Sequence, residues 1–212
     1  MKLNKKDRIL FIGDSVTDGD RDRTTGADLG QGYPLIIAKT LKKHYPELEL
    51  AFFNRGIGGD KLNDMAARWR EDCLVLKPTI VSILIGINDT WHTVGQEQFG
   101  HIEELQRFEQ QYRSLLESLQ RELKCQIVLM EPFVLPYPKD REAWRRDLDP
   151  RIQVVRKLAN EFQADLIPLD GILNAIGIKR NFAYLTGEDG VHPTPTGHET
   201  IANAWLKAVE KD

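Results

Sequence analysis

The sequence predicts an α/β protein, a three-layer αβα sandwich in which helices cover both faces of a parallel sheet of about five strands. Two observations lead to this prediction. Short apolar runs alternate with segments of helical periodicity, and the runs at residues 9–12 and 79–85 are almost continuously apolar. A strand buried on both faces loses the alternation of apolar and polar side chains, as happens in a sheet covered by helices on each side.

The first predicted strand, residues 8–12, runs directly into Gly13-Asp14-Ser15. A polar loop follows over residues 18–32, and a helix is predicted from Tyr33 to Tyr45 because its apolar residues recur at helical spacing. Pro34 suits the first turn of that helix.

The second predicted strand covers residues 48–53 and leads into the glycine-rich segment 54–60. Apolar residues at helical spacing then predict one helix over residues 62–76. The third strand, residues 79–85, is again almost continuously apolar, so we expect it in the centre of the sheet.

The second half of the chain continues the alternation. We expect a long helix over residues 102–123, a strand over 126–130, a helix over 151–162 and a strand over 165–169. The proline-rich segment 132–150 between them shows no clear period. A final helix carries apolar residues at helical spacing, namely Ile201, Trp205, Ala208 and Val209.

Length and composition indicate one domain over residues 1–212, because 41% hydrophobic residues suffice for one buried core and no segment has the composition of a linker. The formal net charge is −3 with acids and bases interspersed, so no basic surface for nucleic acid and no cationic helix for a membrane is predicted. The charged N-terminus precedes no signal-like apolar run. Cys73 and Cys125 lack CxxC spacing and suit reduced thiols, so we expect a cytoplasmic protein.

Polar residues stand after successive predicted strands. Ser15 follows the first strand, Gly59 the second and Asn88 the third, while Asp189 and His192 precede the final helix. Ligands bind beyond the carboxyl ends of parallel strands, so we expect these residues at one edge of the sheet. Each has a structural alternative: the first turn is also typical of an ordinary strand-to-helix junction capped by a side chain, and Asn88 of a simple turn.

Together these residue types meet the needs of acyl transfer. His192 is a candidate base for Ser15, and Asp189 is the candidate group that orients the imidazole and stabilises its charged form. The backbone N–H groups of Ser15 and Gly59 and the Asn88 amide are candidate donors to an oxyanion. No spacing specific to a metal site is present, so we expect no metal.

Four motifs in order, Gly13–Ser15, Asn54–Gly59, Gly86–Asp89 and Asp189–His192, resemble those of the SGNH hydrolases, also called GDSL esterases and lipases. Val16 departs from the leucine of many members. The stretches FIGDSVTD, RWREDCLVLKP and SILIGINDTW are most similar to the xylan and oligosaccharide acetylesterase branch. The resemblance implies a flavodoxin-like sandwich and a serine esterase that needs no cofactor and removes acetyl groups from sugars such as xylo-oligosaccharides, through an acyl-enzyme on Ser15.

Candidate substrate contacts are Asp14 beside the serine, Trp91 just beyond Asn88, and Phe133. Aromatic faces suit sugar rings, although each ring also fits a place in the core or in a subunit contact. The expected partner is a small ester, an acetylated oligosaccharide, and association into a homo-oligomer stays open.

Two alternative functions remain at this stage. One is a broad short-chain carboxylesterase or lysophospholipase of the same mechanism. The other is a flavodoxin-like module that binds a nucleotide or flavin, which is disfavoured because the chain lacks GxGxxG after the first strand and lacks a GKS or GKT loop.

Overall fold

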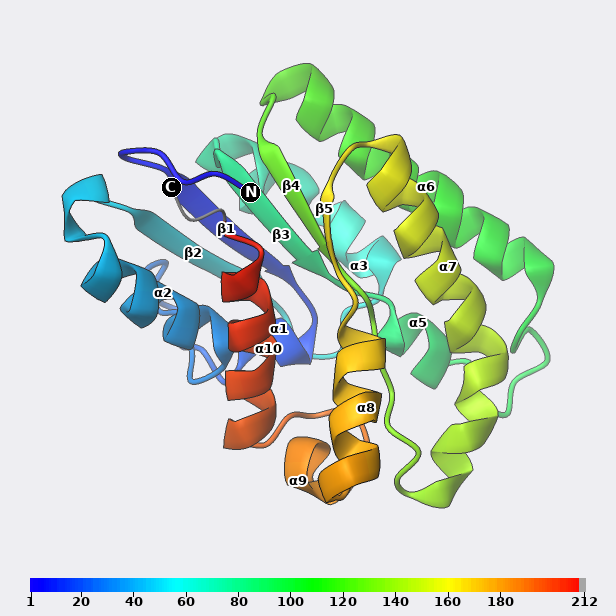
Figure 1. Cartoon of the computed structure of the whole chain (residues 1–212). Helices are drawn as coiled ribbons and strands as arrows, with labels where there is room; N and C mark the ends of the chain where they lie inside the picture. Colours follow the sequence, from blue (N-terminus) through cyan, green and yellow to red (C-terminus); the bar gives the residue numbers. More distant parts are fainter. Residues whose placement is uncertain (210–212) are drawn as a thin grey trace.

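Five parallel strands form one sheet in the order β2-β1-β3-β4-β5 within residues 1–209, the part of the chain that the computed structural model describes (Figure 1). Their bounds are β1 Arg8–Gly13, β2 Ala51–Gly56, β3 Ile80–Leu84, β4 Gln126–Met130 and β5 Asp165–Ile167. Because all neighbouring strands are parallel, their carboxyl ends share one edge of the sheet. The predicted sandwich with a sheet of about five strands is confirmed.

Helices cover both faces of this sheet (Figure 1). Helices α2, α8 and α10 lie on one face, and α3, α6 and α7 lie on the other. The helix bounds are α1 Ser15–Asp18, α2 Tyr33–His44, α3 Leu62–Ala67, α4 Trp69–Asp72, α5 Ile87–Trp91, α6 Ile102–Glu122, α7 Arg145–Glu161, α8 Leu169–Arg180, α9 Ala183–Thr186 and α10 Pro195–Lys207. Three short 3₁₀ helices join them: η1 Pro46–Leu48, η2 Leu74–Leu76 and η3 Lys139–Trp144.

The two faces of β1 enter two separate cores. Ile9 and Phe11 pack into the core under α2, α8 and α10, where the Phe11 and Trp205 ring centroids are 5.6 Å apart. Leu10 and Ile12 pack into the core under α3, α6 and α7. Burial on both faces explains why the strand reads as a continuous apolar run.

Helix α7 begins at Arg145, so the prediction of a start at residue 151 was wrong. Pro150 was interpreted as the end of an irregular segment, yet it lies inside the helix. Proline in a helix interior removes one backbone hydrogen bond, and here tertiary packing outweighs that cost. The residues that anchor this early part of α7 and the turn before it are buried: Trp144, Leu148 and Ile152.

Three further boundaries differ from the prediction. Strand β2 lies three residues later, because Pro46–Leu48 form η1 and the polar Asn54 continues the strand. The helix expected over residues 62–76 is broken into α3, α4 and η2. Strand β5 ends at Ile167, and α8 and α9, which the sequence did not predict, follow it.

Residues 210–212 of the predicted domain lie outside the described part of the chain. The N-terminal amino group donates to the Ala208 carbonyl oxygen at 3.0 Å, which brings both ends of the described chain to the amino-terminal side of the sheet (Figure 1). Among residues 1–209, each helix is too short or too polar to cross a membrane.

Candidate active site

Ser15 stands at the junction of β1 and α1. Strand β1 ends at Gly13, and the Asp14 side chain caps the next helix, its Oδ1 accepting the Val16 N–H at 3.0 Å. Ser15 is the first helical residue and is half-buried. The side-chain cap, which was the structural alternative for this turn, therefore exists. It does not exclude a catalytic role for Ser15, because Asp14 caps the helix that begins at Ser15.

Ser15, His192 and Asp189 form a continuous hydrogen-bonded chain across 177 positions of sequence. Ser15 Oγ lies 2.9 Å from His192 Nε2, and His192 Nδ1 lies 2.5 Å from Asp189 Oδ2. With the ring proton on Nδ1, the serine hydroxyl donates to Nε2 and Nδ1–H donates to the carboxylate. This is the arrangement of nucleophile, base and orienting acid that the sequence predicted.

The turn between Asp189 and His192 fixes the carboxylate. Asp189 Oδ1 accepts the backbone N–H groups of Val191 and His192, each at 2.8 Å. Burial opposes the charge on Asp189, but the hydrogen bond from His192 and these two amides outweigh it and lower the pKa of the carboxyl. The Asp189 hydrogen bond in turn raises the pKa of His192, against the effect of burial.

The candidate oxyanion donors Ser15, Gly59 and Asn88 follow the carboxyl ends of the neighbouring strands β1, β2 and β3. In the described chain the N–H groups of Ser15 and Gly59 donate to no protein acceptor. The neighbouring Gly58 N–H donates to Asp18 Oδ2 at 3.0 Å, which leaves Gly59 as the free donor of the pair. Gly59 has φ +85°, and an added Cβ there would meet no atom within 4 Å, so the space beside this N–H is open.

Asn88 lies in the first turn of α5, directly after β3. Its side chain is 4% exposed, and Nδ2 donates to the Asp60 carbonyl oxygen at 3.1 Å. An amide nitrogen carries two protons, so this bond orients the group and leaves the second N–H for a ligand.

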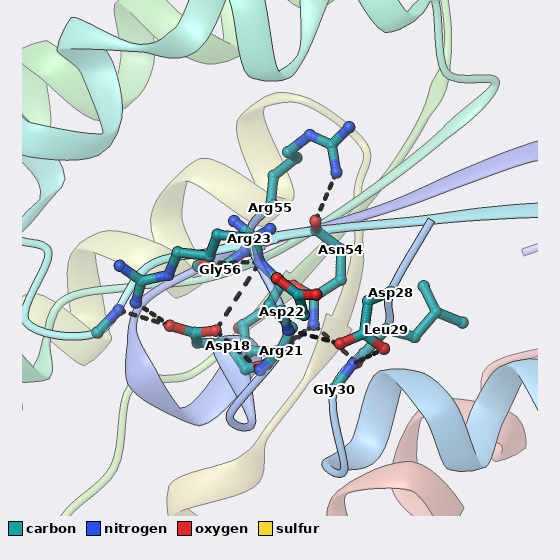
Figure 2. A network of polar contacts seen from close by, with 12 residues as sticks. Asp18, Arg21, Asp22, Arg23, Asp28, Leu29, Gly30, Asn54, Arg55 and Gly56 are labelled. Atoms are coloured by element: carbon teal, nitrogen blue, oxygen red, sulfur yellow. Dashed lines mark hydrogen bonds and ion pairs between the residues drawn. The ribbon is translucent and has the colours of Figure 1, made fainter. Parts of the chain in front are cut away.

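Asn54 and Asp18 belong to one polar network (Figure 2). Their hydrogen bonds to Gly56 and Gly58 hold the start of the loop that carries Gly59. The fully buried Asn54 donates to the carbonyl oxygens of Thr17 at 2.7 Å and Leu29 at 2.9 Å, and its Oδ1 accepts the Gly56 N–H at 2.8 Å. Asp18 binds the Gly58 N–H and also Arg23. Both residues stand within the quoted motifs or just beyond them, but their roles depend on contacts between segments far apart in sequence.

A buried ion pair supports α5. Asp147 accepts from Thr90 Oγ1 at 2.6 Å and from Arg151 Nε at 2.9 Å, and all three side chains are at most 4% exposed. One residue earlier, Asp89 accepts the Leu62 N–H at 3.1 Å and so caps α3. Burial raises the pKa of Asp89 to about 6.

The three predicted substrate contacts fall in different places. Trp91 is half-buried beside the triad, with its ring centroid 5.9 Å from that of His192. Asp14 is 1% exposed, and burial raises the pKa of its carboxyl to about 7, so it lies beneath the serine rather than at the surface. Phe133 is 2% exposed and packs in the core with α2 and α10, which makes it a core residue rather than a wall of the site.

Arg141 is a neighbour of the triad that the sequence did not reveal, since it stands in the proline-rich segment without a motif. Its Nε donates to the Asp189 carbonyl oxygen at 2.9 Å. Among residues 1–209, no group of three His, Cys, Asp or Glu side chains is arranged to hold a metal ion.

Comparison with known proteins agrees with this geometry. An acetylxylan esterase from Geobacillus stearothermophilus is 34% identical to the chain over 99% of its length and 96% of the relative. A structure from Parabacteroides merdae, assigned as a GDSL-like lipase, has a TM-score of 0.88 and 35% identity over 97% of this chain and 96% of that chain.

Three further structures are of the Geobacillus acetylxylan esterase and are described as catalytic mutants, in which a serine, an aspartate or a histidine is replaced by alanine. The serine variant has a TM-score of 0.88 and 33% identity, with 100% of both chains covered. The model of the GDSL-like lipase/acylhydrolase family matches residues 11–200, a span that runs from the strand before Ser15 to α10. The chain therefore belongs to the GDSL-like lipase/acylhydrolase family.

Proposed function

We propose that this protein is a serine esterase that removes acetyl groups from short acetylated oligosaccharides, with an acyl-enzyme on Ser15. The observation that carries the proposal is the hydrogen-bonded chain from Ser15 through His192 to Asp189. The relatives support the substrate class, because a relative that is 34% identical over 99% of the chain is an acetylxylan esterase.

In the first half of the reaction, Ser15 Oγ attacks the ester carbonyl carbon while His192 Nε2 takes the hydroxyl proton. The carbonyl oxygen becomes an oxyanion, which accepts from the N–H groups of Ser15 and Gly59 and from the Asn88 amide. Collapse of this intermediate breaks the bond to the sugar oxygen. His192 gives that oxygen the proton, and the sugar alcohol leaves.

In the second half, water attacks the acetyl group on Ser15 and gives its proton to His192. The second oxyanion accepts hydrogen bonds from the same donors. On its collapse His192 returns the proton to Ser15 Oγ, and acetic acid leaves and ionises to acetate. Asp189 stays ionised throughout, since the turn amides and the imidazole both favour its charged form.

Acetate release from acetylated xylo-oligosaccharides, compared with p-nitrophenyl esters of increasing acyl length, tests the proposal. We expect hydrolysis of the acetyl esters and a steep loss with longer chains. Ser15→Ala should lower kcat at least about a thousandfold. Ser114→Ala, an exposed serine on α6, is the matched control and should leave kcat unchanged.

Each other outcome contradicts part of the proposal. Equal rates of hydrolysis for acetyl esters and for esters of longer acyl chains would favour the alternative function, a broad carboxylesterase or lysophospholipase. Near wild-type turnover by Ser15→Ala would show that the reaction does not pass through an acyl-enzyme on Ser15. A chain that hydrolyses no ester but binds flavin, seen by absorbance, would be the binding module instead.

We also propose that the protein works in the cytoplasm. Cys73 and Cys125 are both unpaired, and burial raises the pKa of the Cys125 thiol to about 11. Unpaired, protonated thiols suit a reducing compartment. Immunodetection in separated cell fractions tests this location, and recovery outside the cytosolic fraction would contradict it.

A further inference from the structure

Residues 132–144, the part of the proline-rich segment that lies between β4 and α7, pack directly against the catalytic turn at residues 189–192. The Leu135 N–H donates to the Gly190 carbonyl oxygen at 2.9 Å. Gly190 has φ +76°, and an added Cβ there would lie 2.3 Å from the Tyr137 carbonyl oxygen. Backbone on backbone at this distance leaves no room for a side chain, so the turn rests on this segment.

Arg141 is the side chain of this segment that reaches furthest into the catalytic turn. Its Nε donates to the Asp189 carbonyl oxygen at 2.9 Å, and its side chain is 13% exposed. The Asp140 carboxylate, 66% exposed, accepts from its NH1 at 2.6 Å and partly balances the charge. A guanidinium this enclosed is held in one geometry by its partners.

The same guanidinium lies over two indole rings. Arg141 Cζ lies 4.2 Å from the Trp144 ring centroid and 5.5 Å from that of Trp91. The two indoles are 5.1 Å apart, and Trp91 is 5.9 Å from the His192 ring. Arg141 thus donates to the backbone of the triad acid through Nε and lies over Trp91, the aromatic neighbour of the triad base.

We infer that Arg141 is a positioning residue of the catalytic turn, which fixes Asp189 and Trp91 relative to each other and so holds the His192 ring at hydrogen-bond distance from Ser15. This inference rests on the proposed function. The Asp189 carboxylate is tied to its own turn by the amides of Val191 and His192. Those bonds do not fix where the turn lies, whereas Arg141 and Leu135 attach it to the body of the protein.

Arginine is suited to this task and lysine is not. Only a planar guanidinium donates in its plane through Nε while its face stacks on a ring. An ammonium group keeps the positive charge and the cation–π attraction but has no donor at the position of Nε. Arg141→Lys therefore separates charge from geometry.

The test compares Arg141→Met and Arg141→Lys with the wild type on p-nitrophenyl acetate. We expect kcat to fall about tenfold to a hundredfold in Arg141→Met, with KM within about twofold, because a misplaced triad loses turnover rather than binding. The acid limb of the kcat/KM profile should move to lower pH, since a loosened bond to Asp189 stabilises the charged imidazole less. Arg141→Lys should show a smaller change in the same direction.

Arg145→Met is the matched control. Arg145 begins α7 and donates to Asp170 at 2.7 Å, but it has no contact with the catalytic turn. It should lower the thermal midpoint while leaving the pH profile in place. A proton NMR spectrum gives a readout independent of turnover, because the downfield His192 Nδ1–H signal should weaken in the Arg141 variants and persist in Arg145→Met.

The results separate two kinds of failure. A wild type without esterase activity would overturn the proposed function and not the contact of Arg141 with the turn. An active wild type with unchanged kcat, pH profile and NMR signal in Arg141→Met would overturn the positioning role, as would equal losses in Arg145→Met. If Arg141→Met does not fold, Arg141→Lys decides by the same measurements, and an unchanged Arg141→Lys then overturns the role.

Discussion

At the scale of single residues, the pH dependence of the reaction depends on one imidazole. His192 accepts the Ser15 proton only when neutral, and the Asp189 hydrogen bond raises its pKa above the ordinary value of 6.5. The charged, inactive form therefore persists to higher pH, and kcat/KM should rise with pH through a midpoint above that value. The titration of His198 does not contribute to this part of the pH profile, because burial lowers its pKa to about 4.

The measurement is a pH profile of kcat/KM for the wild type and for Asp189→Asn. The amide carries no charge, so it stabilises the imidazolium less and should move the midpoint to lower pH as well as lowering the rate. A wild-type midpoint below the ordinary imidazole value, or activity that strengthens towards acid, would contradict the assignment of His192 as the base.

The kinetics of Asn88 variants distinguish an oxyanion donor from a residue that only binds the substrate. If its free N–H binds the tetrahedral intermediate more strongly than the ground state, Asn88→Ala should lower kcat about a hundredfold to a thousandfold and change KM little. Asn88→Asp should lose at least as much, since an ionised carboxylate has no donor. Asn63→Ala is the control, because its exposed side chain accepts a hydrogen bond from Gln111 and, within residues 1–209, makes no other. A higher KM with intact kcat would show uniform binding instead.

At the scale of elements, the buried ion pair of Asp147 and Arg151 holds α5 in place, because Asp147 accepts a hydrogen bond from Thr90 of that helix. Asp147→Ala would leave the Arg151 charge unpaired, with Thr90 Oγ1 also losing its acceptor. We expect a loss of about 3–5 kcal/mol in the free energy of unfolding, measured by urea denaturation. Glu161→Ala removes an acid from the other end of α7, where its exposed pair with Arg113 should matter little. Similar losses in both variants would contradict the special role of the buried pair.

The elements also show what the sequence could predict and why. The bounds of β4 and α6 were predicted to within one residue. A short apolar run with polar ends specifies the strand, and apolar residues at helical spacing over many turns specify the helix. Ser15, His192 and Asp189, which the structure joins by hydrogen bonds, could be singled out because each follows a strand end or stands in a short motif.

The sequence failed where distant contacts decide the local structure. Pro150 indicated the boundary of a helix, but α7 continues through it. The buried Leu148 before the proline and Ile152 after it pack in one apolar cluster and stabilise the helix on both sides of the proline. Helix α8 was missed because Gly171 and Gly177 weaken its helical signal. Arg141 could not be predicted for a different reason: 48 residues separate it from Asp189, and no motif marks the segment in which it stands.

At the scale of the whole molecule, the sheet lies between two cores, and the catalytic turn leads into α10, which packs in one of them. Trp205 of α10 is fully buried, and its Nε1–H donates at 3.1 Å to Ser82 Oγ in the central strand β3. His192 precedes the start of α10 at Pro195 by three residues. Docking of this last helix therefore fixes the base of the triad as well as closing one core.

Truncating Trp205 should consequently weaken the fold as a unit. We expect Trp205→Ala to cost about 3–5 kcal/mol in the free energy of unfolding, through the cavity and the lost packing on Phe11. Ser82→Ala, which keeps the packing but leaves the indole N–H without an acceptor, should cost about 1–3 kcal/mol. In both variants, esterase activity and far-UV circular dichroism should be lost at the same urea concentration, because the last helix and the sheet unfold together. Activity that disappears at lower urea than the dichroism signal would mean that α10 and the catalytic turn detach first, and that the two cores do not unfold cooperatively.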